Sequence, residues 1–199
     1  MLYVSHREPS TDVLGPGQRY ALWLQGCKKR CPHCIFPAGQ SLDCGGEWVA
    51  EEKIFNEIKN VPEVTGVTIS GGEPFLQAAA LAKLIKFLRD DTNLDVMIFT
   101  GYTLLELKNR HDSATDFILS NTDILIDGEY REELNTNSIY RGSDNQVIHF
   151  LTPKYLPFKN LIEKTKNRSV EFVCRKDNEL FMIGIPPKNF DKDFIKRIF

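Results

Sequence analysis

The sequence predicts an α/β fold, in the form of an open, partial (βα)6-type barrel with a mostly parallel sheet. Short apolar runs alternate with segments whose apolar residues recur at helical spacing, which is typical of βαβ units. Several of the apolar runs end at a glycine, namely Gly71, Gly101 and Gly128. Ligands of parallel α/β folds bind beyond the carboxyl ends of the strands, so the chemistry is expected there. About four or five such units are too few for a closed barrel of eight strands.

The expected strands are runs of aliphatic, aromatic and β-branched residues bounded by glycine or polar residues. They are residues 20–24, 64–70, 94–100, 123–127, 146–151, 170–174 and 180–185. The last two are expected to form a hairpin around Lys176, Asp177 and Asn178. The earlier strands alternate with helical segments, which favours their pairing in one sheet.

Helices are expected in residues 49–60, from Pro74 onward, in residues 103–119 and in residues 190–199. Pro74 suits the first position of a helix because that position needs no intrahelical N–H. Apolar residues at helical spacing mark the core face of this second helix: Leu81, Leu84, Ile85 and Leu88. The helix over residues 103–119 is expected to break near His111 and Asp112.

Composition favours one soluble globular domain of 199 residues, with 42% hydrophobic and 26% charged residues. The formal net charge is −2, so no strong field draws the chain to nucleic acid or to an anionic membrane. Residues 1–13 lack a basic segment followed by an apolar one, and no apolar run is long enough for a membrane span. We therefore expect a cytoplasmic protein. Residues 153–199 carry too many apolar side chains for a disordered tail and are expected to pack on the domain as a C-terminal extension.

Three of the five cysteines stand close together in the pattern C-x3-C-x2-C, at Cys27, Cys31 and Cys34. An odd count with this clustering indicates metal binding or redox chemistry rather than a disulfide framework. Thiolates suit iron–sulfur clusters and zinc. Ferredoxin-type clusters take four cysteines, so three would leave one iron open to a substrate or cofactor. The basic residues 28–30 would offset the negative charge of such a cluster.

A structural zinc site is the alternative explanation of the same spacing. Zinc accepts cysteines at this separation, but a structural site needs a fourth ligand. Cys44 or His33 would have to supply it. This alternative describes a zinc-dependent interaction module instead of an enzyme.

A second motif, Gly71-Gly72-Glu73-Pro74, closes the expected strand of residues 64–70. Glycines let a backbone approach a ligand closely and adopt positive φ angles. Main-chain carbonyls there can accept hydrogen bonds from an ammonium group, and Glu73 adds negative charge. Taken alone, the motif also suits a simple turn before a helix.

The cysteine spacing together with Gly-Gly-Glu-Pro at the end of the next strand resembles the radical S-adenosylmethionine superfamily. The resemblance implies that the three cysteines ligate a [4Fe-4S] cluster whose fourth iron binds the amino and carboxylate groups of S-adenosylmethionine. It also implies reductive cleavage of that cofactor to a 5′-deoxyadenosyl radical, which abstracts a hydrogen atom. The aromatic residue usual before the last cysteine is matched by His33, to which we assign no catalytic role.

The same resemblance places cofactor contacts at the strand ends. The candidates are Ser70, Gly71, Gly72, Glu73, Thr100 and Asp127. The Gly-Gly-Glu-Pro segment would bind the amino group of the cofactor. Asp127 would accept hydrogen bonds from the ribose hydroxyls, and Thr100 would bind other polar groups. Both residues also suit turns that end strands.

Further segments point to one branch of the superfamily. Residues 15–19 resemble the Gly-Pro-Gly-x-Arg loop of activating enzymes for glycyl radical proteins. Residues 100–103, 123–130 and 140–146 resemble segments of the activase of anaerobic (class III) ribonucleotide reductase. The resemblance implies that the radical is passed to a glycine Cα of a partner protein. It also implies an electron donor such as flavodoxin or ferredoxin.

The chain departs from the compact activases after Pro153, because they end soon after the segment matched by residues 141–146. The added residues contain no further cysteine cluster, so no auxiliary iron–sulfur site is expected. They leave a second enzymatic function open, in which a small molecule or a peptide is modified directly.

Overall fold

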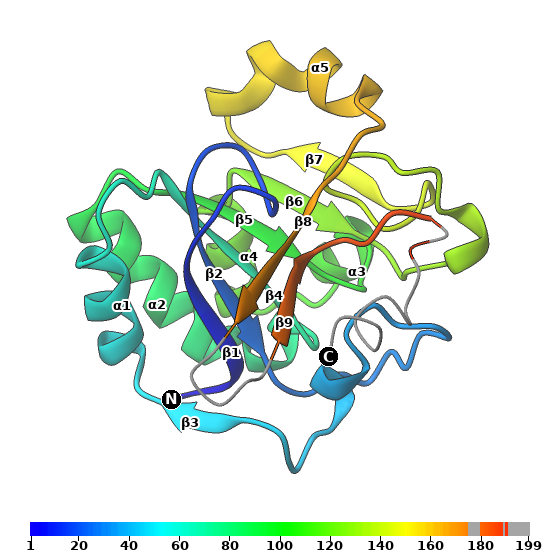
Figure 1. Ribbon diagram of the computed structural model, residues 1–199. Helices are drawn as coiled ribbons and strands as arrows, with labels where there is room; N and C mark the ends of the chain where they lie inside the picture. Colours follow the sequence, from blue (N-terminus) through cyan, green and yellow to red (C-terminus); the bar gives the residue numbers. More distant parts are fainter. Residues whose placement is uncertain (175–179, 189, 191–199) are drawn as a thin grey trace.

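The computed structural model describes residues 1–174, 180–188 and 190 (Figure 1). Its main sheet has seven strands in the order β3-β1-β2-β4-β5-β6-β7. They are β1 Leu2–Thr11, β2 Arg19–Leu24, β3 Glu47–Val49, β4 Gly66–Gly71, β5 Asp95–Phe99, β6 Ile124–Asp127 and β7 Val147–Phe150. Strands β2, β4, β5 and β6 pair in parallel, whereas β1 and β7 run against their neighbours. The α/β class with a mostly parallel sheet is therefore confirmed, while closure into a partial barrel stays a prediction.

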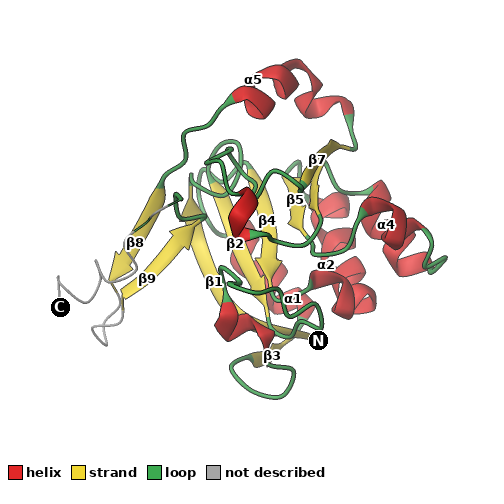
Figure 2. Ribbon diagram, turned by 90° about the vertical axis from the view of Figure 1, so that its right-hand side faces the viewer, coloured by secondary structure: helices red, strands yellow, loops and turns green. Residues whose placement is uncertain are grey.

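Helices cover one side of this sheet, and a separate hairpin covers the other (Figure 2). The α-helices are α1 Glu51–Lys59, α2 Ala78–Asp91, α3 Leu104–Lys108, α4 Ser113–Ser120 and α5 Lys159–Lys164. Short 3-10 helices are η1 Pro37–Gln40, η2 Pro74–Gln77, η3 Glu132–Leu134 and η4 Pro153–Phe158. The hairpin consists of β8 Val170–Cys174 and β9 Leu180–Gly184. Within the described part of the chain, none of the helices is both long and apolar enough to cross a membrane.

The apolar periodicity of the sequence identifies the core correctly. The predicted face of α2 is completely buried: Leu81, Leu84, Ile85 and Leu88. All six residues of β2 are buried, because the helices cover one face of this strand and the hairpin the other. The predicted break near His111 is also present, since His111 has a φ of 51° and separates α3 from α4. The side chains of Thr103 and Asp112 cap these two helices.

A buried ion pair anchors the loop before β2. Arg19 is fully buried, and its guanidinium lies 2.7 Å from the carboxylate of Asp95 on β5. The same guanidinium donates to the carbonyl of Pro16 at 2.9 Å and to the hydroxyl of Thr68 at 2.6 Å. A Cβ at Gly15 would lie 2.6 Å from the Arg19 side chain, so the glycine leaves room for it. Gly15 and Arg19 of the Gly-Pro-Gly-x-Arg segment are therefore buried, whereas Gly17 and Gln18 are exposed.

Several elements differ from the sequence-based expectations. The expected helix over residues 49–60 begins only at Glu51, because residues 47–49 pair with β1 as strand β3. Neither β1 nor the helical turns of residues 153–164 were expected. The turn of the hairpin lies outside the described residues. So does the expected helix over residues 190–199, apart from Phe190.

The hairpin lies against the sheet through apolar contacts. Ile183 is fully buried in a cluster with Leu14 and Trp23, and Phe181 packs against this cluster. On β8, Glu171 accepts a hydrogen bond of 2.6 Å from the Thr11 hydroxyl at the end of β1. The hairpin of β8 and β9 thus lies on the face of the sheet that the helices leave open (Figure 2).

Candidate active site

One cavity collects nearly all the residues that the sequence analysis singled out. The three cysteines of the motif line it, each half-buried and none in a disulfide. The ends of β4 and β5 supply the other predicted residues of its lining: Ser70, Gly71, Gly72, Glu73 and Thr100. The segments meet because parallel strands β2, β4 and β5 all end at this edge of the sheet. Asp127 is the one predicted contact that does not line the cavity, although its neighbour Gly128 does.

The cysteine loop is fastened to its surroundings by main-chain hydrogen bonds. Gly26 donates to the carbonyl of Gly39 at 2.8 Å, and its own carbonyl accepts from the N–H of Glu73 at 2.8 Å. The amide of Gln25 donates to the carbonyls of Ala38 and Ser41, both at 2.9 Å. The loop is therefore held at its base by the Gly-Gly-Glu-Pro segment and by the turn after the motif.

The two glycines of Gly-Gly-Glu-Pro make room for the protein's own backbone. A Cβ at Gly72 would lie 2.2 Å from the carbonyl oxygen of Gly26. A Cβ at Gly71 would lie 2.3 Å from the carbonyl oxygen of Leu24, and Gly71 has a φ of 104°. The two glycines therefore allow a close approach to β2 and to the start of the cysteine loop, and their approach to a ligand stays a prediction.

Glu73 joins the end of β4 to the end of β5. Its fully buried carboxylate accepts hydrogen bonds from the Thr100 hydroxyl and the Gly101 N–H, both at 2.8 Å, and from the Phe75 N–H at 3.0 Å. Burial raises the pKa of Glu73, while these hydrogen bonds act in the opposite direction. Because all three donors belong to the protein, the structure gives this carboxylate a positioning role at the cavity wall.

The carboxylate of Asp127 is engaged by other parts of the protein. It accepts from the N–H of Leu104 at 2.6 Å and lies 2.9 Å from Nε2 of His149. Its second oxygen accepts from the N–H of Val147 at 3.3 Å. These partners tie the end of β6 to the start of α3 and to β7.

Main-chain donors surround the cysteine thiols. Burial raises the pKa of the Cys27 thiol, and hydrogen bonds from the N–H groups of Lys29 and Arg30 oppose this shift. Burial likewise raises the pKa of Cys31, opposed by a hydrogen bond from the N–H of Tyr130. Hydrogen bonds to sulfur are among the features that tune iron–sulfur sites. Three thiols on one cavity with N–H donors beside them fit a cluster held by three thiolates.

Lys29 links the cysteine loop to two glutamates that sequence reasoning did not single out. Its ammonium lies 3.1 Å from Glu129 and 3.4 Å from Glu106. It also lies 4.4 Å from the centre of the Tyr102 ring. Lys29 lines the cavity, whereas its basic neighbours Lys28 and Arg30 are exposed. No motif marks Glu106 on α3, and Glu129 falls in the segment 123–130, to which the sequence analysis assigned no ion pair.

The two candidates for a fourth zinc ligand have other partners. Cys44 is exposed, and its sulfur lies 3.1 Å from the Ser41 hydroxyl. His33 lies 3.4 Å from the carboxylate of Glu132. Neither residue lines the cysteine cavity. In the described residues, no group of three or more His, Cys, Asp or Glu side chains is arranged to hold a single metal ion.

Several lining residues had no signal in the sequence. Ile35 and Phe36 follow the last cysteine, and Gly184 and Ile185 come from the end of β9. They belong to no motif, and only the fold brings them together. The last two show that the C-terminal residues reach the cavity itself.

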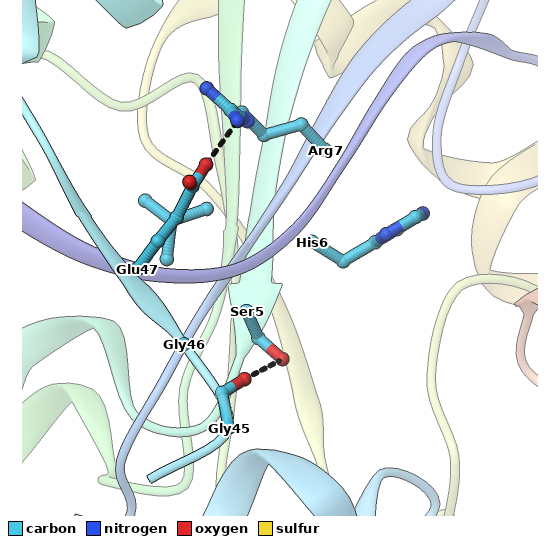
Figure 3. A pocket seen from close by; sticks show the side chains of 7 residues that line it. Ser5, His6, Arg7, Gly45, Gly46 and Glu47 are labelled. Atoms are coloured by element: carbon cyan, nitrogen blue, oxygen red, sulfur yellow. Dashed lines mark hydrogen bonds and ion pairs between the residues drawn. The ribbon is translucent and has the colours of Figure 1, made fainter. Parts of the chain in front are cut away.

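A different pocket lies between β1 and the segment before β3 (Figure 3). There Arg7 pairs with Glu47, and the Ser5 hydroxyl donates to the carbonyl of Gly45 at 3.5 Å. Arg7 also binds Glu57 on α1 at 3.0 Å. This pocket shares no lining residue with the cysteine cavity. It is therefore separate from the candidate active site.

Comparison with known proteins assigns the chain to a family. The 4Fe-4S single cluster domain family matches residues 13–149. The anaerobic ribonucleoside-triphosphate reductase-activating protein of Vibrio cholerae is 33% identical over 151 residues, which cover 72% of this chain and 95% of that protein. The chain belongs to this family of activating proteins.

Other members give the same picture. The activating protein of Escherichia coli K12 is 31% identical over 150 residues, covering 72% of this chain and 95% of the relative. That of enterobacteria phage T4 is 26% identical over 149 residues, covering 70% and 88%. Nearly the whole of the two bacterial relatives is matched, while more than a quarter of this chain is not. The matched domain ends at residue 149, so β8, β9 and Ile185 lie beyond it.

Proposed function

We propose that this member of the family is a radical S-adenosylmethionine enzyme whose Cys27, Cys31 and Cys34 ligate one [4Fe-4S] cluster. The observation that carries the proposal is the single cavity that joins these cysteines to the ends of β4 and β5. Three thiolates would leave one iron of the cluster open to a cofactor, which we propose to be S-adenosylmethionine. Membership of a family with a 4Fe-4S single cluster domain supports the choice of cluster over zinc.

When bound, such a cluster would supply the electron for reductive cleavage of S-adenosylmethionine to methionine and a 5′-deoxyadenosyl radical. This radical would take a hydrogen atom from a glycine Cα of a partner protein and leave a glycyl radical there. The relatives are named after anaerobic ribonucleoside-triphosphate reductase, so we propose that reductase as the partner. A flavodoxin or a ferredoxin would supply the electron.

The residues of the cavity would divide the work as follows. Main-chain carbonyls of residues 70–73 would accept hydrogen bonds from the ammonium group of the cofactor. Glu73 would hold Thr100 and Gly101 in place beside it, as its hydrogen bonds in the structure suggest. Asp127, which the sequence assigns to the ribose, would act by fixing the start of α3 near the cavity, since its carboxylate binds Leu104.

The rest of the chain would shape access to this site. We propose that the sheet forms the wall of a partial barrel, open where a protein partner approaches. Residues 153–199 would then be an extension packed on a single domain, and the contacts of Ile183 with Trp23 support this arrangement. Cleavage inside such a cavity shields the radical from solvent.

The test uses protein reconstituted with iron and sulfide under anaerobic conditions. We expect about four irons per chain if three cysteines hold one cluster. On reduction with dithionite, the protein should release 5′-deoxyadenosine and methionine from S-adenosylmethionine in equal amounts. Protein that holds zinc, or a cluster that releases no 5′-deoxyadenosine, would contradict the proposal.

A further inference from the structure

A groove of about 460 Å³ adjoins the cysteine cavity. The two spaces share Cys34, Ile35 and Tyr130 as lining residues. Because they share a cysteine of the motif, the groove reaches the cysteine loop from outside the cofactor cavity. A ligand in the groove would therefore touch the same loop as a cofactor in the cavity.

The two walls of the groove come from different parts of the chain. One wall consists of the cysteine loop and the segment after β6, with His33, Pro37 and Glu132. The other consists of the end of the hairpin and the residues that follow it, with Met182 and Pro187. The matched family domain ends at residue 149, so this second wall lies outside it.

A buried arginine fastens the two walls to each other. Arg168 is only 9% exposed, and its guanidinium donates to the side-chain oxygen of Asn135 and to the carbonyl of Pro186, both at 2.7 Å. It also donates to the carbonyl of Arg141 at 2.7 Å. Asn135 and Pro186 both line the groove, on opposite walls. These hydrogen bonds hold the two walls together in the free protein. Less conformational entropy of the walls is therefore lost when a ligand binds.

The lining favours a polypeptide over a small polar molecule. Several polar side chains of the wall have partners within the protein: His33 lies 3.4 Å from Glu132, and Asn135 binds Arg168. The side chain of Lys188 is exposed at the rim. Apolar side chains make up much of the remaining surface, among them Ile35, Met182 and Phe190. A nucleotide or sugar would need several polar groups directed at it. An extended chain segment with small side chains instead buries apolar surface against such walls.

We propose that this groove receives an extended segment of the partner protein and leads its glycine to the cysteine cavity, with Met182, Pro186 and Pro187 as the wall that selects the partner. The proposal rests on the proposed function, because only a radical formed at the cysteines gives the groove a purpose. It adds that partner choice depends on residues outside the matched family domain.

Photo-cross-linking tests directly where the partner segment binds, and it does not require the enzyme to be active. We would place p-benzoylphenylalanine in place of Met182 or Pro187 and, as a matched control, in place of Leu161, which is exposed on α5. The probe is purified anaerobic ribonucleoside-triphosphate reductase. We expect cross-links to the reductase from positions 182 and 187 at least tenfold more abundant than from position 161. Equal yields from all three positions, or cross-links only within the chain itself, would overturn the proposal.

Activity measurements then separate this proposal from the function on which it rests. Met182→Trp narrows the groove without touching the cysteine cavity, and Leu161→Trp makes the same kind of change on α5. We expect Met182→Trp to cleave S-adenosylmethionine within twofold of the wild-type rate but to lower the glycyl radical yield on the reductase at least tenfold. An unchanged glycyl radical yield in Met182→Trp would overturn the proposal that the groove receives the partner segment. A wild-type protein that gives 5′-deoxyadenosine but no glycyl radical overturns the proposed partner instead.

Discussion

The hydroxyl of Thr100 donates a hydrogen bond of 2.8 Å to the carboxylate of Glu73. The two residues stand at the ends of adjacent parallel strands, β4 and β5, and both line the cysteine cavity. In the sequence they belong to separate motifs. The hydrogen bond joins the two motifs in one wall of the cavity. A substitution of either residue is therefore expected to disturb both strand ends.

Glu73→Gln should destabilise the protein even without a cluster. The amide NH₂ of glutamine can only donate, so it would face one of the N–H donors that the carboxylate now accepts. An unsatisfied buried group costs about 2 kcal/mol, which thermal unfolding of the apoprotein can measure. Thr100→Val is the comparison variant and should cost about 1 kcal/mol for each of the two hydrogen bonds that the hydroxyl makes, one to Glu73 and one from the Tyr102 N–H. Equal stability of Glu73→Gln and wild type would show that the carboxylate does not hold the wall together.

Gly72→Ala should prevent the cysteine loop from packing against the end of β4. Its Cβ would lie 2.2 Å from the backbone oxygen of Gly26, which cannot move without shifting the loop. We expect the iron content to fall by at least half after reconstitution. Gly101→Ala is the control, since the nearest atom to its Cβ would belong to the flexible Lys29 side chain, at 3.1 Å, and the Glu73 carboxylate would lie at an ordinary contact distance of 3.5 Å. The idea fails if Gly72→Ala loads as much iron as Gly101→Ala.

The ligand set can be checked by removing cysteines one at a time. Ala in place of Cys27, Cys31 or Cys34 should remove most of the iron and all cleavage of S-adenosylmethionine. Ala in place of Cys44 or Cys174, which are exposed, should leave about four irons per chain. Iron analysis and the visible spectrum measure both. Loss of the cluster in Cys44→Ala would show that the cavity does not contain the complete ligand set.

Acid stability should depend on Asp123. Burial opposes ionisation of this carboxyl, but hydrogen bonds from Arg89, Thr152 and the Val96 N–H outweigh it and lower its pKa. A lowered pKa stabilises the fold above the unfolded value of about 3.9, and this stabilisation is lost as the pH falls through the folded value. Asp123→Asn should cost about 2 kcal/mol at pH 7 and much less at low pH.

The comparison requires a control with the same change in charge. Asp116→Asn, on the exposed surface of α4, should change the unfolding free energy by less than about 0.5 kcal/mol. Urea unfolding of the apoprotein at a series of pH values gives both curves. If the loss of unfolding free energy in Asp123→Asn stayed constant down to low pH, the lowered pKa of Asp123 would be contradicted.

The periodicity of the sequence predicted the α/β class, the strands of the parallel centre and the core face of α2. It could not predict β1, because His6, Arg7 and Glu8 interrupt its apolar run and only pairing with β2 and β3 makes it a strand. Nor did the sequence give the direction of β7. No α-helix connects β6 to β7, so the chain returns antiparallel.

The candidate site was predictable where chemistry dictates residue type and spacing, as in the cysteine loop. It was not predictable where contacts are made by ordinary residues from distant segments. Phe36 and Ile185 line the cavity without belonging to any motif, and Lys29 meets Glu106 only after folding. Asp127 belongs to a segment that resembles the family, yet it does not line the cavity. Its carboxylate accepts a hydrogen bond from the N–H of Leu104 instead.

Transfer of deuterium tests the central claim most directly. Anaerobic ribonucleoside-triphosphate reductase labelled with deuterium at its glycine Cα atoms would be incubated with the reduced, reconstituted protein and S-adenosylmethionine. Mass spectrometry of the 5′-deoxyadenosine then reports where its new hydrogen came from. The account predicts one deuterium per 5′-deoxyadenosine formed in step with the glycyl radical, and none with Cys31→Ala. Unlabelled 5′-deoxyadenosine formed alongside a glycyl radical would contradict direct abstraction by this protein.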